Sequence, residues 1–340
     1  MNIIGRKQEI KELEIVHYSN MPEFVVVYGR RRVGKTFLVN QYFGNSFIFK
    51  VTGIAERNAR QKQLANFGES LRAYGSPLLP DPDNWTEAFR MLRALIENTR
   101  IKGKKVVFID ELPYMYTKRC DLVSALEHFW NDWGNTREDL LLIICGSATS
   151  WIVKNIVNSK GGLHNRLTRK IYLKPFSLAE SKAYLTDRGI RLSDRELVET
   201  YMVMGGIPYY LSLIEKGKSL AQNIDEMFFM RKGRLDGEFR NLYGGLFEES
   251  DNYIKVVEAL GKKNQGMTRD EIIQVTKISN GGTLTRILED LDQCDLIRKY
   301  RSYGKESHGT IHQLTDFYTL FYFKFIQKYV PDEKGSGRIN

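Results

Sequence analysis

The sequence contains few cysteines and no long apolar run, and both absences restrict the class of protein. The three cysteines, Cys120, Cys145 and Cys294, lie far apart in 340 residues, so they supply neither a disulfide framework nor paired zinc ligands. Apolar runs such as 140–145 and 317–323 are far shorter than the roughly 20 residues of a membrane-spanning helix. The chain also begins without a signal-peptide core. We therefore expect a cytoplasmic protein with free thiols and no membrane contact.

The charge balance does not identify a partner. Lysine and arginine outnumber the acidic residues by 51 to 41, which gives a net charge of +10. Such an excess permits contact with nucleic acid, but it equally suits a nucleotide-binding surface or simple solubility. The length predicts two or three compact units, and the 42% of hydrophobic residues can fill their cores.

The clearest motif is an apolar strand that runs into a glycine-punctuated loop. Residues 24–28 are β-branched or aromatic, which favours a buried strand, and residues 37–42 have helical potential. The strand, loop and helix order is the context of a phosphate-binding loop. We predict that ATP binds at Gly29, Arg30, Arg31, Arg32, Val33, Gly34, Lys35, Thr36 and Phe37.

Each residue type in this loop has a physical role. Gly29 and Gly34 let the backbone curl so that successive N–H groups converge on phosphate oxygens, assisted by the positive end of the next helix. Lys35 is expected to reach the β- and γ-phosphates, and Thr36 to place its hydroxyl on Mg²⁺. The arginines at 30–32 occupy variable positions. We favour a solvated loop crest for them over contact with phosphate or a partner.

Two later strands end in polar residues. The strand 106–109 is followed by Asp110 and Glu111, the Walker B arrangement, in which the first acid holds Mg²⁺ through water and the second polarises the attacking water. The strand 140–145 leads to Ser147, which either senses the γ-phosphate or attacking water, or caps the helix that begins near residue 149. The sequence leaves these two roles of the serine equally open.

The remaining pattern predicts an α/β fold. Strands are expected at 47–51 and 169–173, and they alternate with helical stretches. Alternation of this kind indicates a parallel, doubly wound P-loop NTPase sheet with helices on both faces. The helical stretches between the strands are 57–74, 85–99, 121–133 and 150–157.

Taken in order, these segments resemble the archaeal-type ATPase family, a STAND-like branch of the AAA+-like P-loop NTPases. The opening segment 3–13, the run 165–170 and the run 205–211 also match that family's pattern. The resemblance implies that the serine-bearing strand lies between the two Walker strands, which favours Ser147 as a sensor. It further implies an adenine site that includes the residues Ile4, Gly5, Arg6 and Pro208.

Two of these implied roles have plainer alternatives. Arg166 falls where relatives carry an arginine that acts on the γ-phosphate of a neighbouring subunit, which would require a homo-oligomer, but it is equally read as an arginine that caps the preceding helix. The resemblance implies that Pro208 lies against the nucleotide base, as part of the family's helical lid. Without the resemblance, Gly205 and Gly206 read as a helix stop followed by a proline.

The C-terminal third predicts a winged helix. A helix at 253–260, a capping box from Thr268 to Glu271, a third helix at 283–292 and strands at 296–300 and 309–314 follow in that order. The predicted domains are a core at 1–173, a helical lid at 174–245, a winged helix at 246–330 and a flexible tail at 331–340. Many relatives continue into a nuclease-like domain, but no such acidic constellation follows here, and we expect no nuclease activity.

These features predict a slow Mg-ATP hydrolase that acts as a nucleotide-dependent molecular switch and contacts a protein partner. The alternative is an ATP-dependent DNA-binding protein similar to replication initiators, because Arg298, Lys299, Arg301 and Lys305 make the wing basic. Acidic residues after Arg286, among them Glu289, Asp290, Asp292 and Asp295, oppose that alternative because they would meet phosphates with the wrong sign. We favour regulation over DNA contact.

Overall fold

The chain divides into two compact units, each with its own core. A computed structural model describes residues 3–56, 59–75, 78–117, 120–159, 161–230, 233–247, 249–301 and 309–328. Unit 1 comprises Met1–Gly29 and Gly34–Leu173, and unit 2 comprises Arg30–Val33 and Lys174–Asn340. The phosphate-binding loop is therefore shared, because its four middle residues belong to unit 2.

Unit 1 is built on a parallel sheet with the order β2-β3-β4-β1-β5. Its side chains alternate between two covered faces, as in Phe24 and Val26 against Val25 and Val27, and all four are fully buried. The five strands lie where the sequence predicts them. They are β1 (Glu23–Tyr28), β2 (Phe47–Thr52), β3 (Lys105–Asp110), β4 (Leu140–Gly146) and β5 (Arg169–Tyr172).

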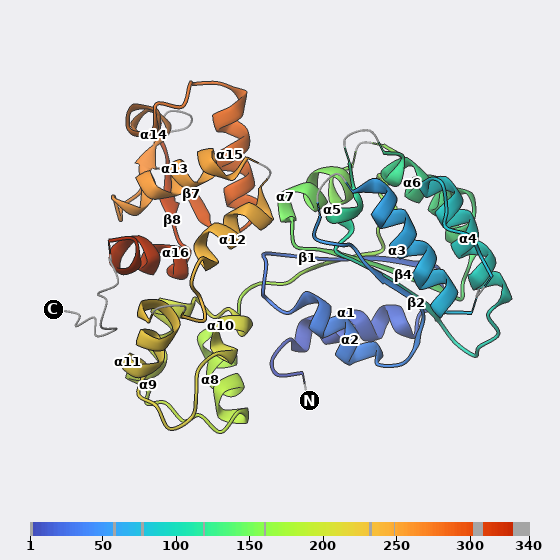
Figure 1. Cartoon of the computed structure of the whole chain (residues 1–340), viewed down its shortest axis with the longest axis horizontal. Helices are drawn as coiled ribbons and strands as arrows, with labels where there is room; N and C mark the ends of the chain where they lie inside the picture. The colour runs from blue at the N-terminus through green and yellow to red at the C-terminus, as the bar shows by residue number, and fades with distance from the viewer. Residues whose placement is uncertain are drawn as a thin grey trace. The chain divides into compact units, whose positions relative to one another are not determined.

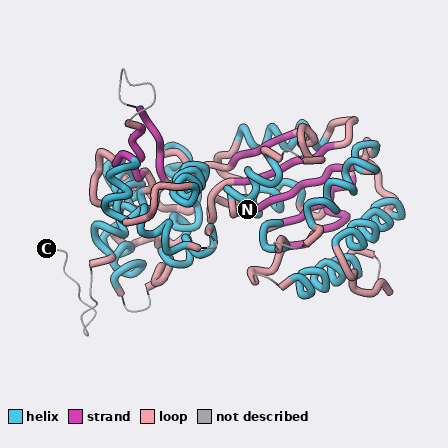
Figure 2. Tube along the Cα trace, turned by 90° about the horizontal axis from the view of Figure 1, so that it is seen from above, coloured by secondary structure: helices cyan, strands magenta, loops and turns pink. Residues whose placement is uncertain are grey.

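Helices cover both faces of this sheet, as predicted for a doubly wound fold. Figure 1 shows α1 (Lys7–His17) and α2 (Lys35–Phe43) on one face and other helices of unit 1 on the opposite face, and Figure 2 shows the strands from above. The predicted helix at 150–157 is correct in place but divides into α7 (Thr149–Ile152) and a π-helical turn, η2 (Val153–Val157). The other helices are α3 (Arg60–Ala73), α4 (Trp85–Asn98), α5 (Leu112–Met115), α6 (Leu122–Asp132) and the turn η1 (Gly134–Thr136).

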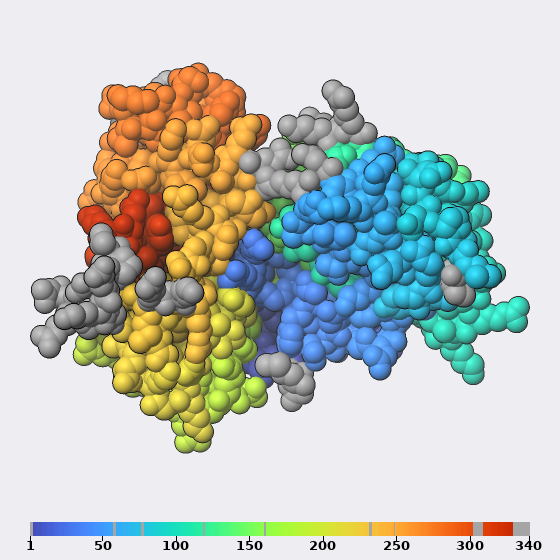
Figure 3. Space-filling view, in the orientation of Figure 1, coloured from blue at the N-terminus to red at the C-terminus, as the bar shows by residue number. Residues whose placement is uncertain are grey.

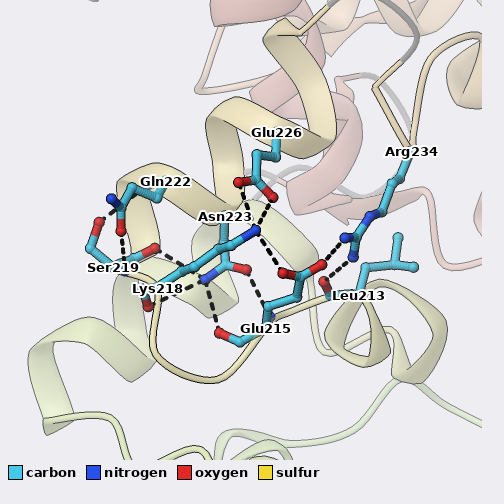
Figure 4. A network of polar contacts seen from close by, with 8 residues as sticks. All are labelled: Leu213, Glu215, Lys218, Ser219, Gln222, Asn223, Glu226 and Arg234. Carbon is cyan, nitrogen blue, oxygen red and sulfur yellow. Dashed lines mark hydrogen bonds and ion pairs between the residues drawn. The ribbon is translucent and has the colours of Figure 1, made fainter.

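The first part of unit 2 consists of short helices joined by polar contacts. In Figure 4, Glu215 pairs with Lys218 at 2.6 Å and with Arg234, while its N–H donates to the buried Asn223 at 2.8 Å. Ser219 opens a helix with a capping box. The elements are α8 (Leu178–Asp187), α9 (Asp194–Met204), α10 (Pro208–Ser212), α11 (Leu220–Ile224), η3 (Asp225–Phe229) and α12 (Glu238–Leu246).

The second part of unit 2 combines helices with a small antiparallel sheet of order β6-β8-β7. The predicted capping box is confirmed, because Thr268 accepts from the N–H of Glu271 at 3.3 Å and Glu271 accepts from the N–H of Thr268 at 2.8 Å. The short strand β6 was not predicted. The elements are α13 (Ser250–Gly261), β6 (Met267–Thr268), α14 (Arg269–Thr276), α15 (Gly282–Gln293), β7 (Ile297–Arg301), β8 (Thr310–Leu314), α16 (Phe317–Phe321) and η4 (Tyr322–Ile326).

The predicted domain boundaries relate to these units in different ways. The boundary predicted after residue 173 coincides with the end of unit 1. The division of the remaining chain into a lid and a winged helix stays a prediction, and the predicted tail at 331–340 and Lys305 lie outside the described residues. Among the described helices, none combines the length and apolar character that crossing a membrane requires.

Candidate functional site

The loop between β1 and α2 is shaped by two glycines with left-handed backbone angles. Gly29 has φ 143°, and a Cβ at this position would lie 2.3 Å from the carbonyl oxygen of Leu173. Gly34 has φ 90° and is the N-cap of α2. Because side chains at both positions would be strained, the sequence requires glycine where the chain leaves the strand and where it enters the helix. This is the backbone curl that the sequence predicts.

Lys35 and Thr36 turn their side chains to the carboxyl edge of the sheet. The Lys35 ammonium donates to the carbonyl oxygen of Gly29 at 2.9 Å, and the residue is only 5% exposed. The Thr36 hydroxyl donates to Oδ2 of Asp110 at 2.8 Å. The first turn of α2 and the end of β3 are thus joined directly within unit 1.

Asp110 offers a hard oxygen ligand at the end of β3. The residue is 1% exposed, and burial raises the pKa of its carboxyl group. Within the described ranges, no lysine, arginine or histidine forms an ion pair with it. Mg²⁺ prefers such oxygens and uses one or two protein ligands together with phosphates, so Asp110 and Thr36 fit the ion. Among the described residues, no cluster of three or more histidine, cysteine, aspartate or glutamate side chains could hold a metal ion.

Ser147 holds the carboxylate of Glu111. Oε2 of Glu111 accepts from the Ser147 hydroxyl at 2.8 Å and from the Ser147 N–H at 3.1 Å. The alternative in which this serine caps the next helix is wrong, because the N-cap of α7 is Ala148 and forms no side-chain cap. Glu111 itself has φ 49°, a left-handed conformation that turns the chain sharply after β3. The two side chains therefore form one acid-hydroxyl pair.

The strand order explains how these residues meet. β4 lies between β3 and β1, as the family resemblance implied. Ile109 is paired with Ile144, and Val27 is paired with Cys145, so all three strands end at the same level. Cys145 was read only as a free thiol, yet it is fully buried beside Asp110, and burial raises its pKa well above the ordinary value. The only sequence signal was its place two residues before Ser147.

The arginine crest, which we define as Arg30, Arg31 and Arg32, belongs to unit 2. The preferred expectation of a solvated crest is wrong for Arg30, which is 2% exposed. Arg30 pairs with Asp316 at 2.5 Å, and Arg32 pairs with Glu238 at 2.7 Å. Sequence reasoning missed both acids, since they lie more than 200 positions away and carry no local signal of an arginine partner.

The opening segment and two further residues of the loop, Val33 and Phe37, differ in burial. Gly5 and Arg6 have φ 68° and 58°, and Arg6 is buried at the start of α1, 3.7 Å from Glu9. Val33 is 1% exposed, whereas Phe37 is 40% exposed on α2. The predicted contacts of Ile4, Gly5, Arg6 and Phe37 with the nucleotide stay predictions.

Arg166 and Pro208 lie in different units. Arg166 is exposed between η2 and β5, and in the part of unit 1 that is described its side chain donates no hydrogen bond to the preceding helix. Both the capping role and the role at a neighbouring subunit stay predictions. Gly205 is the left-handed C-cap of α9, and Pro208 is the first residue of α10, so the helix-stop reading is confirmed. The role of the proline at the base stays a prediction.

Comparisons with known proteins identify the family of the chain. A family model described as an ATPase domain predominantly from Archaea matches residues 3–214. An uncharacterized protein of Methanocaldococcus jannaschii is 26% identical over 327 residues, which cover 95% of this chain and 68% of that protein. A second protein of the same organism, described as an uncharacterized ATP-binding protein, is 40% identical over 45 residues, or 13% of this chain and 76% of its own.

Solved structures share the fold at low sequence identity. The Walker-type ATPase of Pyrococcus abyssi has a TM-score of 0.66 and 19% identity, with 95% of this chain and 96% of that chain covered. The Aeropyrum pernix ORC2 protein, in its ADPNP-ADP complexes, has a TM-score of 0.55 and 12% identity, with 95% and 92% covered. At these identities the likeness concerns the fold alone, and it confirms the predicted α/β P-loop class.

Proposed function

Because the chain belongs to the family of ATPase domains found predominantly in Archaea, we propose that it binds Mg-ATP and hydrolyses it slowly as a nucleotide-dependent molecular switch. One observation in unit 1 carries the proposal. The Thr36 hydroxyl lies 2.8 Å from Asp110, and Ser147 lies 2.8 Å from Glu111, at the edge where the phosphate-binding loop ends. Ligand contacts of open α/β sheets are made at this edge.

The phosphates are held by the backbone and by Lys35. The first N–H groups of a helix point out of its N-terminus, so those of α2 can bind anionic oxygens, and the helix dipole favours negative charge there. Lys35 exchanges the carbonyl oxygen of Gly29 for a phosphate oxygen. Thr36 and Asp110 would hold Mg²⁺, which when bound neutralises charge on the phosphate oxygens.

Glu111 and Ser147 act on the water that attacks the γ-phosphate. The carboxylate of Glu111 accepts a hydrogen bond from that water and so orients it in line with the bond to be broken. Ser147 keeps the carboxylate in position through its hydroxyl and its N–H. While both groups bind Glu111, the serine donates to no phosphate oxygen. In this arrangement Ser147 acts on the γ-phosphate only through the carboxylate that it positions.

Nucleotide binding by the purified full chain tests this function. A titration with ATP and Mg²⁺ is expected to saturate, and Lys35→Ala is expected to weaken binding about 10- to 100-fold, since a charged hydrogen bond contributes about 1.5–3 kcal/mol. Lys62→Ala is the matched control, because Lys62 is an exposed lysine of unit 1 that pairs with Glu56 at 2.7 Å. Absence of saturable binding by the wild-type protein would dismiss the proposal.

Unit 2 supplies the element that the switch controls. We assign 174–245 to a helical lid and 246–330 to a winged-helix module that regulates nucleotide exchange and contacts a protein partner. The helices α13, α14 and α15 followed by the β7-β8 hairpin support that assignment. Arg166, exposed on unit 1, is our candidate for a residue that acts on a neighbouring subunit. Its role predicts that hydrolysis per chain rises with protein concentration in the wild type but not in Arg166→Ala.

DNA binding through α15 and β7 is a second candidate, and one observation favours it. Asp292 pairs with Lys299 at 3.1 Å, and Asp290 accepts from the Tyr253 hydroxyl at 2.5 Å, so two of the acids on this helix already have protein partners. Titration with duplex DNA at two salt concentrations tests this candidate, because phosphate contacts give a steep dependence on salt. Weak binding that is independent of salt would remove it.

A further inference from the structure

The arginine crest is fixed by unit 2 through three separate contacts. Arg30 and Asp316 form an ion pair in which the two side chains are only 3% and 1% exposed. Burial alone would raise the pKa of Asp316, but the Arg30 guanidinium and the hydrogen bonds from Thr319 together outweigh burial and hold the pKa below its ordinary value. Both groups are therefore charged in the folded protein, and each is the neutralising partner of the other.

The other two arginines extend this attachment to α12 and α10. Arg32 pairs with Glu238 and lies over the ring of Tyr209, with its guanidinium carbon 4.1 Å from the ring centroid. Glu238 is also held by the Tyr210 hydroxyl at 2.7 Å. Arg31 donates to the carbonyl oxygen of Asn241 at 3.0 Å. Each side chain of the crest thus has a defined acceptor in unit 2.

Asp316 is itself held rigidly. It is the N-cap of α16, and its Oδ2 accepts from the N–H of Thr319 at 3.0 Å and from the Thr319 hydroxyl at 2.6 Å. That hydroxyl lies 3.1 Å from the buried hydroxyl of Tyr243 on α12. In Figure 3 the red surface of α16 lies between the orange and yellow parts of unit 2, and α16 contacts α9. The network therefore ties the crest to the interior of unit 2.

The division of the loop between the units gives these contacts a function. The two junctions fall at Gly29 and at Gly34, the residues of the loop with φ 143° and φ 90°. Lys35, whose ammonium is held by Gly29, lies just beyond the second junction. The conformation of the phosphate-binding loop is thus specified from both sides, and four of its residues depend on contacts with distant segments.

We infer that Asp316 and Glu238 are positioning residues for the phosphate-binding loop, so that α16 and α12 set its affinity for nucleotide. This inference rests on the proposed function of the loop. The side chains of the crest are engaged with unit 2, and the loop contributes backbone N–H groups to the phosphates. When the crest is released, only a fraction of molecules has a competent loop, and the apparent Kd rises in proportion.

Hydrogen exchange of the nucleotide-free full chain tests the positioning directly. In Asp316→Asn, the backbone amides of residues 30–33 are expected to exchange at least about tenfold faster than in the wild type, because the crest loses its charged partner. Glu215→Gln is the matched control, since Glu215 is a carboxylate of unit 2 with two cationic partners in the separate network of Figure 4. Unchanged exchange in a folded Asp316→Asn protein would overturn the inference.

Nucleotide binding distinguishes positioning from a general structural role. Asp316→Asn is expected to raise the Kd for Mg-ATP about tenfold, while turnover at saturating ATP stays within about threefold of the wild type. The loss is expected to disappear when the same substitution is made in an Arg30→Gln background, because the effect acts through that arginine. An equal loss in both backgrounds would contradict the inference.

Two further arms make the outcome unambiguous. If Asp316→Asn does not fold, Glu238→Gln is used in the same two measurements, because glutamine still accepts from Tyr210 but carries no charge for Arg32. Failure of the wild type to bind Mg-ATP would defeat the proposed function, whereas the exchange experiment would still decide whether α16 positions the loop. Wild-type exchange and a wild-type Kd in both Glu238→Gln and Asp316→Asn would refute the inference but leave the proposed function intact.

Discussion

The two units each bury an acidic residue beside the phosphate-binding loop sequence, but they neutralise it differently. Asp110 of unit 1 is 1% exposed and Asp316 of unit 2 is 3% exposed. Burial raises the pKa of Asp110, whereas for Asp316 the Arg30 guanidinium and the hydrogen bonds from Thr319 together prevail over burial and the pKa is lowered. Similar burial is therefore accompanied by opposite pKa shifts. The difference arises because Asp316 has a cationic partner, Arg30, and Asp110 forms no ion pair with a described residue.

The partners explain the difference in chemical role. Asp110 and Glu111 accept hydrogen bonds from the hydroxyl groups of Thr36 and Ser147, which do not cancel a charge. A buried carboxylate without a cation is costly, so a site of this kind gains stability when a cation arrives with a ligand. Asp316 already has its cation. The comparison indicates that the Asp110 carboxylate of unit 1 can still pair with a cation. The Asp316 carboxylate of unit 2 is already paired and fixes Arg30.

Removing the charge of Asp316 is expected to give the largest effect on stability. Asp316→Asn leaves the Arg30 guanidinium buried without a countercharge, and breaking a buried pair in this way costs about 3–5 kcal/mol. Denaturant unfolding of the nucleotide-free chain measures the loss. Exposed Glu97→Gln, which breaks the surface pair with Arg93 at 3.0 Å, is the control and should change stability by less than about 1 kcal/mol. Equal losses in the two variants would break the comparison.

The second prediction concerns turnover. Glu111→Gln is expected to lower kcat about 10²- to 10³-fold while the Kd for Mg-ATP changes little, because the amide keeps the shape of the side chain but cannot orient and polarise water as a carboxylate does. Single-turnover hydrolysis and a binding titration measure the two quantities separately. Undiminished hydrolysis would show that Glu111 does not orient the attacking water. The proposed contrast in role between the acids of unit 1 and those of unit 2 would then fail for Glu111.

The third prediction addresses how Glu111 is positioned. Ser147→Ala removes the hydroxyl at 2.8 Å from Glu111 but leaves the N–H contact at 3.1 Å. We expect kcat to fall about tenfold, since one hydrogen bond to a charged group contributes about 1.5–3 kcal/mol and half of the attachment remains. Ser147→Thr keeps the hydroxyl and is expected to recover most of the rate. An alanine variant with wild-type turnover would show that the N–H alone positions the carboxylate.

The sequence predicted the acids of unit 1 because their signal is local. Asp110 and Glu111 end an apolar strand, and all five strands lie where their apolar runs are. Ser147 was predicted in position but not in partner, because its contact with Glu111 depends on the order of β3 and β4, which a single chain does not reveal by periodicity. That order came only from the family resemblance.

The acids of unit 2 carry no comparable local signal. Asp316 stands before α16 as an ordinary N-cap, and its ion-pair partner is 286 positions away in the sequence. The three arginines precede the lysine of the phosphate-binding loop. From the sequence they were expected to be solvated, because charged residues in loops usually are. Only the folded chain shows that the crest is part of unit 2. Contacts between residues so far apart in the sequence are determined by tertiary packing, which local propensity does not encode.

The smallest prediction reverses the sign of the first. Asp110→Asn removes a buried charge that has no cationic partner in the described structure, and asparagine retains a carbonyl oxygen for the N–H of Glu111, which lies 3.0 Å away. We expect the nucleotide-free chain to gain about 0.5–2 kcal/mol, the usual size of a stabilising substitution. Thermal unfolding at pH 7 without Mg²⁺ measures the gain. With saturating Mg-ATP the order should invert, because the ligand then stabilises the wild type more strongly. A variant that is less stable in both conditions would show that the carboxylate serves the fold of unit 1, as Asp316 serves that of unit 2.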